Sequence, residues 1–563
     1  MRNAEELRRK IWLAMDILKR EKLYLHSKKI PIDTPNGAYE FPVVVGFSVL
    51  NAIVGNGSML LYGGYGYGKT TLLKYLGRIL TGASIEEIEA SMLRSNPQLT
   101  EEKIVARLHL GKLIGSGEEV VIWRKFVKSF WKIVDEINRL SPAAQDAILS
   151  LLGEGIAKYF DETYHIPRYV LYATINPRDV GTFPLGMPLL DRFGIAVIVE
   201  APALEDIEEI MDAPDDKLVR RIIPNVMTVE ELVDVWGYVW MTPLSDDARL
   251  FISTLVKELS ICDRVNKETG IFLTMGSKIC SGCHFEPLDT VCKIVYTPLS
   301  VRAQRDLVRY SKALAWLLGL NEVPLSVVVS IAPYVLWHRL RFADKYLERK
   351  FYDRFKLARE IVNIVLRNYL QRAPLMSAYY DLRRGIVDTN MIISIKNTAN
   401  SDLIIKHEVI PKIDMLLEDK YIMFASRLMS AIRDRDEDRA RAILNKAREE
   451  LSKDQYGILR TMYCSELRKY GRTVCVPLSV WRSKREEIGE ILQEPKVWEV
   501  GEIKGSPKVL RIDRGIEFVE IYMFGVSDNS PVFITIYSLT NKLYKRIAMT
   551  LGIDVDNTYK EKA

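Results

Sequence analysis

A glycine-rich loop that ends in lysine and threonine offers the clearest chemistry in this 563-residue chain. Residues 63–70 read Gly-Gly-Tyr-Gly-Tyr-Gly-Lys-Thr and fit the pattern G-x-x-x-x-G-K-[ST]. Glycines let backbone N–H groups turn inward around phosphate oxygens, Lys69 can reach the β- and γ-phosphates, and the Thr70 hydroxyl can ligate Mg²⁺. The apolar run 58–62 predicts a strand before the loop, and residues 71–80 predict a helix after it. This context favours a nucleotide-binding loop over a chance glycine-rich turn.

Two carboxylates come directly after a second apolar run, over residues 130–134. The carboxyl end of a parallel strand beside a phosphate loop is where Mg²⁺ needs an oxygen ligand. Asp135 can hold the metal through its water shell, and Glu136 can polarise the attacking water as a general base. A solvated acid at a strand end is the alternative, and the phosphate loop upstream argues against it. The nucleotide-binding set is therefore expected to be Gly63, Gly64, Gly66, Gly68, Lys69, Thr70, Thr71 and Asp135, with Thr70 and Asp135 as the Mg²⁺ ligands.

Three further polar residues follow predicted elements at positions where they could act on a phosphate. Asn176 ends the apolar run 169–175, and its amide can hydrogen-bond the attacking water or the γ-phosphate, although Asn-Pro is also a common turn. Arg192 precedes a short strand and, without context, could equally be a surface ion-pair member. Ser300 is a plausible N-cap of a long helix, which places Arg302 in the first helical turn.

These residues together resemble the MoxR family of AAA+ ATPases, in a long, archaeal-type form with a C-terminal extension. The resemblance rests on Asp-Glu-Ile-Asn-Arg at 135–139, Gln145, Ala-Thr-Ile-Asn-Pro at 173–177 and Leu-Asp-Arg-Phe at 190–193, and runs from about residue 40 to about residue 345. It implies Walker A roles for Lys69 and Thr70, Walker B roles for Asp135 and Glu136, sensor 1 for Asn176, the arginine finger for Arg192 and sensor 2 for Arg302. The phosphate loop departs from the family, which usually carries proline at the second position, another proline before a valine, and that valine; here these positions are Gly64, Tyr65 and Tyr67.

The resemblance also implies a function. An arginine finger acts on the neighbouring subunit's nucleotide, so a homo-oligomer is expected, usually a hexameric ring, that hydrolyses ATP with Mg²⁺. The work would be chaperone-like remodelling or assembly of a protein client, with a partner that carries a von Willebrand factor A domain. A nucleic-acid-remodelling motor of the helix-2-insert clade is the alternative, and a nucleotide-gated switch or scaffold is a third. The intact Glu136 and Arg192 argue against a mere switch.

Two segments are expected to contact the client through a ring pore. Residues 156–166 alternate around Asp161-Glu162 and resemble the pre-sensor hairpin, and residues 83–113 are expected to hold the helix-2 insert. Ordinary surface structure is the alternative for both.

A cysteine cluster interrupts the predicted helical lid. A Cys-x-x-Cys pair can present two thiolates to one tetrahedral ion, and metal binding would stabilise a small insert. The proposed structural Zn²⁺ ligands are Cys262, Cys280, Cys283 and Cys292, with His284 as an alternative fourth ligand. A disulfide within the pair, or free buried thiols, are the competing interpretations. Cys464 and Cys475 could be buried thiols or one disulfide.

Composition sets the broad class of the chain. A hydrophobic content of 48% with 27% charged residues is ordinary for a globular protein, and the length predicts two to four domains. The net charge of +6 neither demands nor excludes a nucleic-acid partner. Residues 1–23 lack an apolar signal-peptide core, and no apolar run is long enough to cross a membrane. With six cysteines in such a chain, we expect a cytoplasmic protein without a disulfide framework.

The expected fold class is α/β: an AAA+ P-loop parallel-sheet core with a helical lid, a helical region, and a small β-rich C-terminal module. Helical periodicity runs over 351–470, with two amphipathic helices hinged near 433–436. Strand-like alternation follows at 497–500, 509–512, 518–523 and 532–537. The expected domains are an N-terminal helix over 1–30, the core over 31–203, a lid over 204–345 with the cysteine-rich insertion at 265–296, a helical extension over 346–480 and the β-rich module over 481–563.

Overall fold

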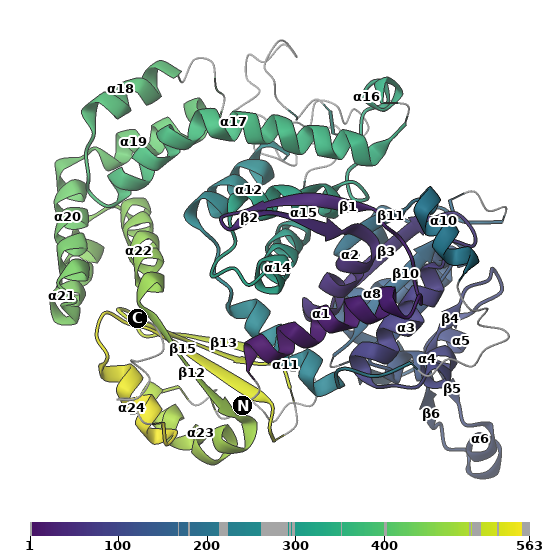
Figure 1. Cartoon of the computed structure of the whole chain (residues 1–563). Helices are drawn as coiled ribbons and strands as arrows, with labels where there is room; N and C mark the ends of the chain where they lie inside the picture. Colours follow the sequence, from purple (N-terminus) through teal and green to yellow (C-terminus); the bar gives the residue numbers. More distant parts are fainter. Residues whose placement is uncertain are drawn as a thin grey trace. The chain divides into compact units, whose positions relative to one another are not determined.

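The computed structural model describes most of the chain, and it divides the chain into two compact units (Figure 1). The N-terminal unit comprises residues 2–252 and 299–362, and the C-terminal unit comprises residues 253–298 and 363–563. The described residues are 3–166, 168–177, 181–212, 223–259, 291, 294–295, 299–350, 352–398, 402, 404–494, 497, 508–525 and 528–553.

Five parallel strands form the central sheet of the N-terminal unit, in the order β11-β3-β10-β7-β4. They are β3 (Ser58–Gly63), β4 (Leu93–Arg94), β7 (Trp131–Asp135), β10 (Val170–Ile175) and β11 (Ile195–Val199). Parallel sheets are covered on both faces, which is why these strands are almost continuously apolar in sequence. Every residue of β10, the middle strand, is buried. The predicted α/β fold class is confirmed. Within this sheet, the very short β4 is the one strand that was not predicted from the sequence.

Helices cover this sheet, and the amino-terminal helix packs on other helices (Figure 1). Helix α1 (Ala4–Arg20) packs against α2 (Val43–Ile53), α3 (Lys69–Thr81) and α11 (Val229–Met241). Its apolar positions at helical spacing are buried, so the helix is amphipathic. A hairpin, β1 (Lys29–Thr34) with β2 (Gly37–Pro42), connects α1 to α2.

The predicted lid is helical. The described residues form α11, α12 (Asp246–Glu258), α14 (Val301–Leu317) and α15 (Leu325–Leu336), and α12 continues into the C-terminal unit. Ser300 caps α14 by accepting a hydrogen bond from the Ala303 amide at 3.0 Å, as predicted.

The shorter elements of this unit lie between the main strands and helices. They are α4 (Ile85–Ser91), α5 (Glu101–Ile104), β5 (Ala106–Leu108), α6 (Leu110–Ser116), β6 (Val121–Trp123), α7 (Lys125–Lys128), η1 (Ile137–Arg139), α8 (Pro142–Glu154), β8 (Ile156–Tyr159), β9 (Glu162–His165), α9 (Met187–Leu190), α10 (Leu204–Met211) and α16 (Asp344–Arg349). The strands β8 and β9 pair as an antiparallel hairpin, as expected. The strands β5 and β6 form a second hairpin around α6, and it extends beyond residue 113, where the predicted insert ended.

The amino end of β7 contains a fully buried lysine. Lys132 has no exposed surface, and its ammonium group donates to the carbonyl oxygens of Phe126, Val127 and Ser129 at 2.5, 2.7 and 2.6 Å. A carbonyl oxygen near the end of a helix lacks an intrahelical donor, so the lysine satisfies groups at the end of α7 that would otherwise be buried without a partner. Burial lowers the pKa of Lys132 to about 7.

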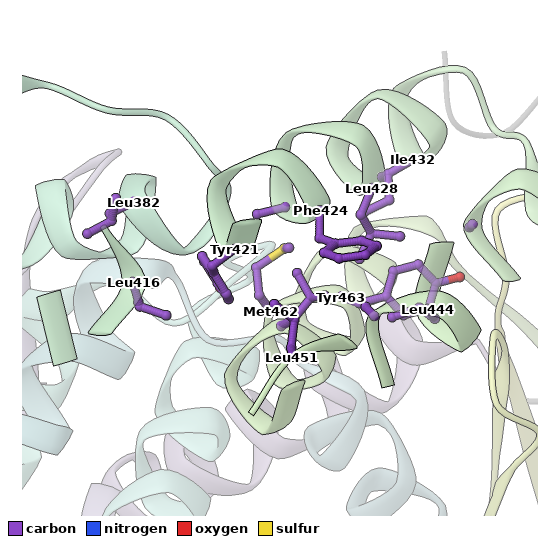
Figure 2. Packing of buried hydrophobic residues seen from close by; sticks show 14 of the residues in the cluster. Leu382, Leu416, Tyr421, Phe424, Leu428, Ile432, Leu444, Leu451, Met462 and Tyr463 are labelled. Atoms are coloured by element: carbon purple, nitrogen blue, oxygen red, sulfur yellow. The ribbon is translucent and has the colours of Figure 1, made fainter. Parts of the chain in front are cut away.

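The C-terminal unit begins with a helical layer. The long helix α17 (Arg354–Arg383) enters it, followed by α18 (Thr389–Thr398), the π-helical turn η3 (Ile405–Val409), α19 (Ile410–Leu416), α20 (Asp419–Arg433), α21 (Glu437–Glu450), α22 (Lys453–Leu467) and the short η4 (Arg468–Tyr470). Figure 2 shows their shared core, in which Tyr421, Phe424 and Tyr463 lie among leucine and isoleucine side chains. The predicted helix pair hinged near residues 433–436 is confirmed by α20 and α21.

An antiparallel sheet follows this helical layer, in the order β12-β15-β14-β13. Its strands are β12 (Gly471–Pro477), β13 (Lys508–Asp513), β14 (Phe518–Met523) and β15 (Pro531–Tyr537). One face packs on α23 (Leu478–Leu492) and α24 (Lys542–Thr550) through the apolar side chains of alternate strand residues. The β-rich C-terminal module is therefore confirmed.

One predicted strand of this module was misplaced. Val497 is helical, and the rest of the segment 497–500 is outside the described residues. The fourth strand is β12, which stands in sequence between two helices. Cys475 lies on this strand opposite Phe533, and Cys464 is a free, half-buried thiol, so the suggested disulfide between these two cysteines is wrong.

Among the described residues, no helix is long and apolar enough to cross a membrane.

Candidate active site

The carboxyl ends of three neighbouring parallel strands bring the predicted residues to one edge of the sheet. The phosphate loop follows β3, Asp135 and Glu136 follow the apolar part of β7, and Asn176 follows β10, which pairs with both. They surround a cavity of about 220 Å³. Its lining consists of Tyr65, Gly66, Tyr67, Gly68, Lys69, Thr70, Thr71, Asp135, Glu136, Thr174 and Asn176.

The phosphate loop adopts a backbone that requires glycine at two positions. Gly66 and Gly68 have φ angles of 75° and 68°, in the left-handed region that other residues rarely adopt. Gly68 precedes the first residue of α3, so the free N–H groups of that helix start at the cavity. A helix amino terminus favours anions, which fits the loop to a phosphate group.

Lys69 is 6% exposed, and its ammonium protons are all used within the protein. It donates to the carbonyl oxygens of Gly63 and Gly64 at 2.8 and 2.7 Å and to Oδ1 of Asn176 at 2.8 Å. Gly63 and Gly64 therefore contact the lysine through their carbonyl groups. Burial lowers the pKa of Lys69, and the nearby Asp135 and Glu136 oppose that shift.

Hard oxygen donors meet beside the lysine. The Thr70 hydroxyl donates to Oδ1 of Asp135 at 2.7 Å, and the Thr174 hydroxyl donates to the same oxygen at 2.7 Å. Hydroxyl and carboxylate oxygens are the ligands that Mg²⁺ accepts, usually together with water and substrate phosphates. The donor set at this edge therefore fits a magnesium ion held by Thr70 and Asp135.

Glu136 stands at the rim of the cavity with both carboxylate oxygens engaged. Asn176 donates its amide to Oε1 at 2.6 Å, and Arg139 donates to Oε2 at 2.9 Å. The Glu136 backbone has a φ of 54°, which is uncommon outside glycine. Its own N–H donates to the Thr174 hydroxyl at 2.8 Å, so the unusual backbone is fixed by a neighbouring strand.

The two predicted arginines lie outside the lining of this cavity. Arg192 donates to the Pro188 carbonyl oxygen at 3.3 Å, and its guanidinium covers Gly153 of α8, where an added Cβ would approach the arginine Nε to 2.5 Å. Arg302 donates to Asp191 at 3.0 Å, and Ser300 donates to the other oxygen of Asp191 at 2.6 Å. The amino end of α14 is thereby fixed to the segment that carries Arg192.

Three residues of the site were not identified from sequence. Thr174 and Arg139 lie within strings that carried the family resemblance, but a string does not show that they bind Asp135 and Glu136. Asp191 pairs with a residue 111 positions away. A strand-end threonine and a basic residue three positions after the base are the signals that would have pointed to the first two.

The proposed zinc site cannot be placed. Cys262, Cys280, Cys283, Cys292 and His284 lie outside the described residues. Within the described part of the chain, no group of three or more His, Cys, Asp or Glu residues could hold a metal ion.

Known proteins are similar to parts of this chain. Residues 58–193 match the AAA domain of the dynein-related subfamily. Protein MoxR of Paracoccus denitrificans is 25% identical over 312 residues, which cover 52% of this chain and 82% of that protein. Protein MoxR of Methylorubrum extorquens is 27% identical over 157 residues, which cover 27% of this chain and 43% of that protein. The solved structure of a candidate ATPase from Cytophaga hutchinsonii matches with a TM-score of 0.48 and 18% identity, over 65% of this chain and 95% of that one.

The parallel sheet, the phosphate loop and the matched domain define an AAA+ ATPase, a class that uses ATP and Mg²⁺. Within that class, the chain is similar to the two MoxR proteins.

Proposed function

We propose that this chain hydrolyses ATP to ADP and phosphate in the cavity at the carboxyl edge of the sheet, with Mg²⁺. The proposal rests above all on the lining of that cavity, where Lys69, Thr70, Asp135, Glu136 and Asn176 meet from three strands. Each has a side chain that one part of phosphoryl transfer requires.

Each side chain takes one role in this proposal. Lys69 binds the β- and γ-phosphates, and Thr70 and Asp135 hold Mg²⁺, whose charge supports the phosphate oxygens. Glu136 accepts a proton from the attacking water, and Asn176, already bonded to Glu136, orients that water or the γ-phosphate.

The Glu136→Gln variant tests the role of the base. It keeps the size of the side chain and its contact with Asn176, so ATP binding should persist and the oligomer should be trapped with nucleotide. Turnover should fall about 10²–10⁴-fold, to a residual rate that single-turnover measurements can follow. Binding is measured with a fluorescent ATP analogue, and turnover by phosphate release. Undiminished turnover would refute the proposed site.

We further propose that the chain works as a homo-oligomeric ring, usually a hexamer, in which Arg192 serves the neighbouring subunit's site. The position of Arg192 outside the lining of its own cavity supports this role. Arg192→Ala subunits mixed with Lys69→Ala subunits should regain part of the lost hydrolysis, because each would complete the other's site. Zero recovery in a stably assembled mixture would argue against shared sites.

The proposed work of the ring is chaperone-like remodelling or assembly of a protein client, with a partner that carries a von Willebrand factor A domain. Two hairpins of the N-terminal unit, β8–β9 and β5–β6, are the proposed client contacts. Leu110, Ile114 and Phe160 are exposed on them, and the Trp123 and Tyr164 ring centroids lie 5.4 Å apart, joining the two hairpins. Capture with the Glu136→Gln variant, with and without Phe160→Ser, would test whether a client binds there.

The zinc site stays a prediction made from the sequence. Purified protein should hold about one zinc ion per chain, and Cys283→Ser should lose it, because the Cys-x-x-Cys pair supplies two thiolates. Metal analysis that finds no zinc would leave the thiol and disulfide alternatives.

A further inference from the structure

Glu136 is held from two sides by groups of different kinds. The neutral amide of Asn176 meets one carboxylate oxygen, and the charged guanidinium of Arg139 meets the other. Arg139 ends the short helix η1, three residues after Glu136, so the pair forms within one turn of chain. The carboxylate is 24% exposed and the guanidinium 39% exposed, which leaves both within reach of water.

The contact with Asn176 continues to the phosphate loop. Lys69 donates to Oδ1 of Asn176, and the same amide group donates to Glu136, so one side chain connects the lysine to the base. An ammonium group has three protons, and Lys69 gives all three to protein acceptors here. Lys69 cannot bond a phosphate oxygen without giving up or sharing one of these contacts.

We propose that Arg139 is a positioning residue that restrains Glu136 as a base, and that phosphate binding at Lys69 loosens the restraint from the Asn176 side. This inference rests on the proposed function, since it assumes that Glu136 accepts a proton from water during ATP hydrolysis. The inference adds Arg139 to the site and states its effect: Arg139 slows the basal turnover of ATP.

The direction follows from the geometry. Both carboxylate oxygens of Glu136 are already hydrogen-bonded, so an attacking water must compete for them. Arg139 holds Oε2 toward η1, which leaves that oxygen less available to a water molecule. Because the pair is partly exposed, its strength should be that of a surface pair, about 0.2–1 kcal/mol, which corresponds to an effect on rate of at most about fivefold.

Three variants of the full-length chain test the proposal. Arg139→Gln removes the charge, Arg139→Lys keeps it, and Arg514→Gln is a matched control that breaks another Arg–Glu pair with the same three-residue spacing, at 2.7 Å, in the C-terminal unit. Arg139→Gln should raise basal kcat about two- to fivefold with KM for ATP unchanged. Arg139→Lys should stay nearer to the wild-type rate, and Arg514→Gln should match it.

The dependence on Glu136 gives a second readout. In single-turnover measurements, Arg139→Gln should leave the residual rate of the Glu136→Gln protein unchanged, because the group through which Arg139 acts is gone. A fall in kcat on Arg139→Gln, an unchanged kcat, or an equal acceleration in the Glu136→Gln background would each overturn the proposal. Thermal melting and binding of a fluorescent ATP analogue confirm that the variants are folded and competent.

The two levels of inference can fail separately. If the wild-type chain does not hydrolyse ATP, or if Glu136→Gln hydrolyses it normally, the proposed function fails. If wild type is active, Glu136→Gln is inactive and Arg139→Gln is no faster than wild type, only the role of Arg139 is wrong.

Discussion

The two ends of the parallel sheet each bury a lysine, and the two lysines are used differently. Lys69 at the carboxyl edge and Lys132 at the amino end of β7 each donate three hydrogen bonds to protein acceptors. Lys69 lines a cavity and has the Asn176 side chain among its acceptors, whereas all acceptors of Lys132 are backbone carbonyls. A buried and fully bonded cation is therefore no sign of function by itself. What distinguishes Lys69 is an adjacent cavity and an acceptor that can move.

The largest expected effect comes from replacing Lys69, and it is on nucleotide binding. Lys69→Ala should weaken ATP binding about a thousandfold or more, because two charge-assisted hydrogen bonds of about 1.5–3 kcal/mol each are lost. Isothermal titration of the variant measures it, with Lys132→Met as the control that should keep wild-type affinity while folded. Near-normal binding by Lys69→Ala would remove the distinction between the two lysines.

Replacing Lys132 should instead change the stability of the folded protein. Lys132→Met should lower the free energy of unfolding by about 3 kcal/mol, at about 1 kcal/mol for each buried carbonyl left without a donor. Urea denaturation measures the loss. The control is Lys128→Met, at an exposed lysine of α7, the helix next to Lys132, which should change stability little. Equal stability of the two variants would show that the carbonyls find other donors.

A smaller effect is expected on the stability of the protein at acid pH. His338 is buried, and its Nε2–H donates to the Phe193 carbonyl oxygen at 2.9 Å. Burial, together with the adjacent Arg339, holds the pKa of His338 well below the usual 6.5. The folded state therefore keeps this imidazole neutral, while the unfolded chain protonates it as pH falls below 6.5. Stability should drop by up to about 1.4 kcal/mol for each pH unit below that value.

The measurement for His338 is a series of urea denaturations between pH 7.5 and about pH 5. His338→Gln removes the titrating group but can still hydrogen-bond, so the part of the pH dependence due to His338 should vanish in the variant. An unchanged slope would assign the acid sensitivity to other groups.

The sequence was most informative where function depends on a short local string. An apolar run precedes each part of the site: the phosphate loop, the pair Asp135 and Glu136, and Asn176. Parallel pairing of the strands brings their carboxyl ends together, so this part of the site could be predicted from the sequence. The contacts of Arg139, Thr174 and Asp191 could not, because each depends on a side-chain direction or a partner on another element.

The fold shows the same division. The parallel strands were predictable because burial on both faces leaves long apolar runs, whereas β12 was missed because a seven-residue alternating segment between two helices carries little signal. The roles of Arg192 and Arg302 depend on neighbouring subunits and lid movement, and these stay predictions.

Gly153 has a consequence for how the α8 helix is built. A glycine inside a helix weakens it by about 1 kcal/mol relative to alanine, yet even a single methyl group here would collide with the guanidinium of Arg192. The helix therefore keeps a residue of low helix propensity where the Arg192 guanidinium contacts its surface. An alanine at position 153 would stabilise the helix and at the same time displace the arginine side chain, so helix stability and the position of Arg192 are opposed at one backbone atom.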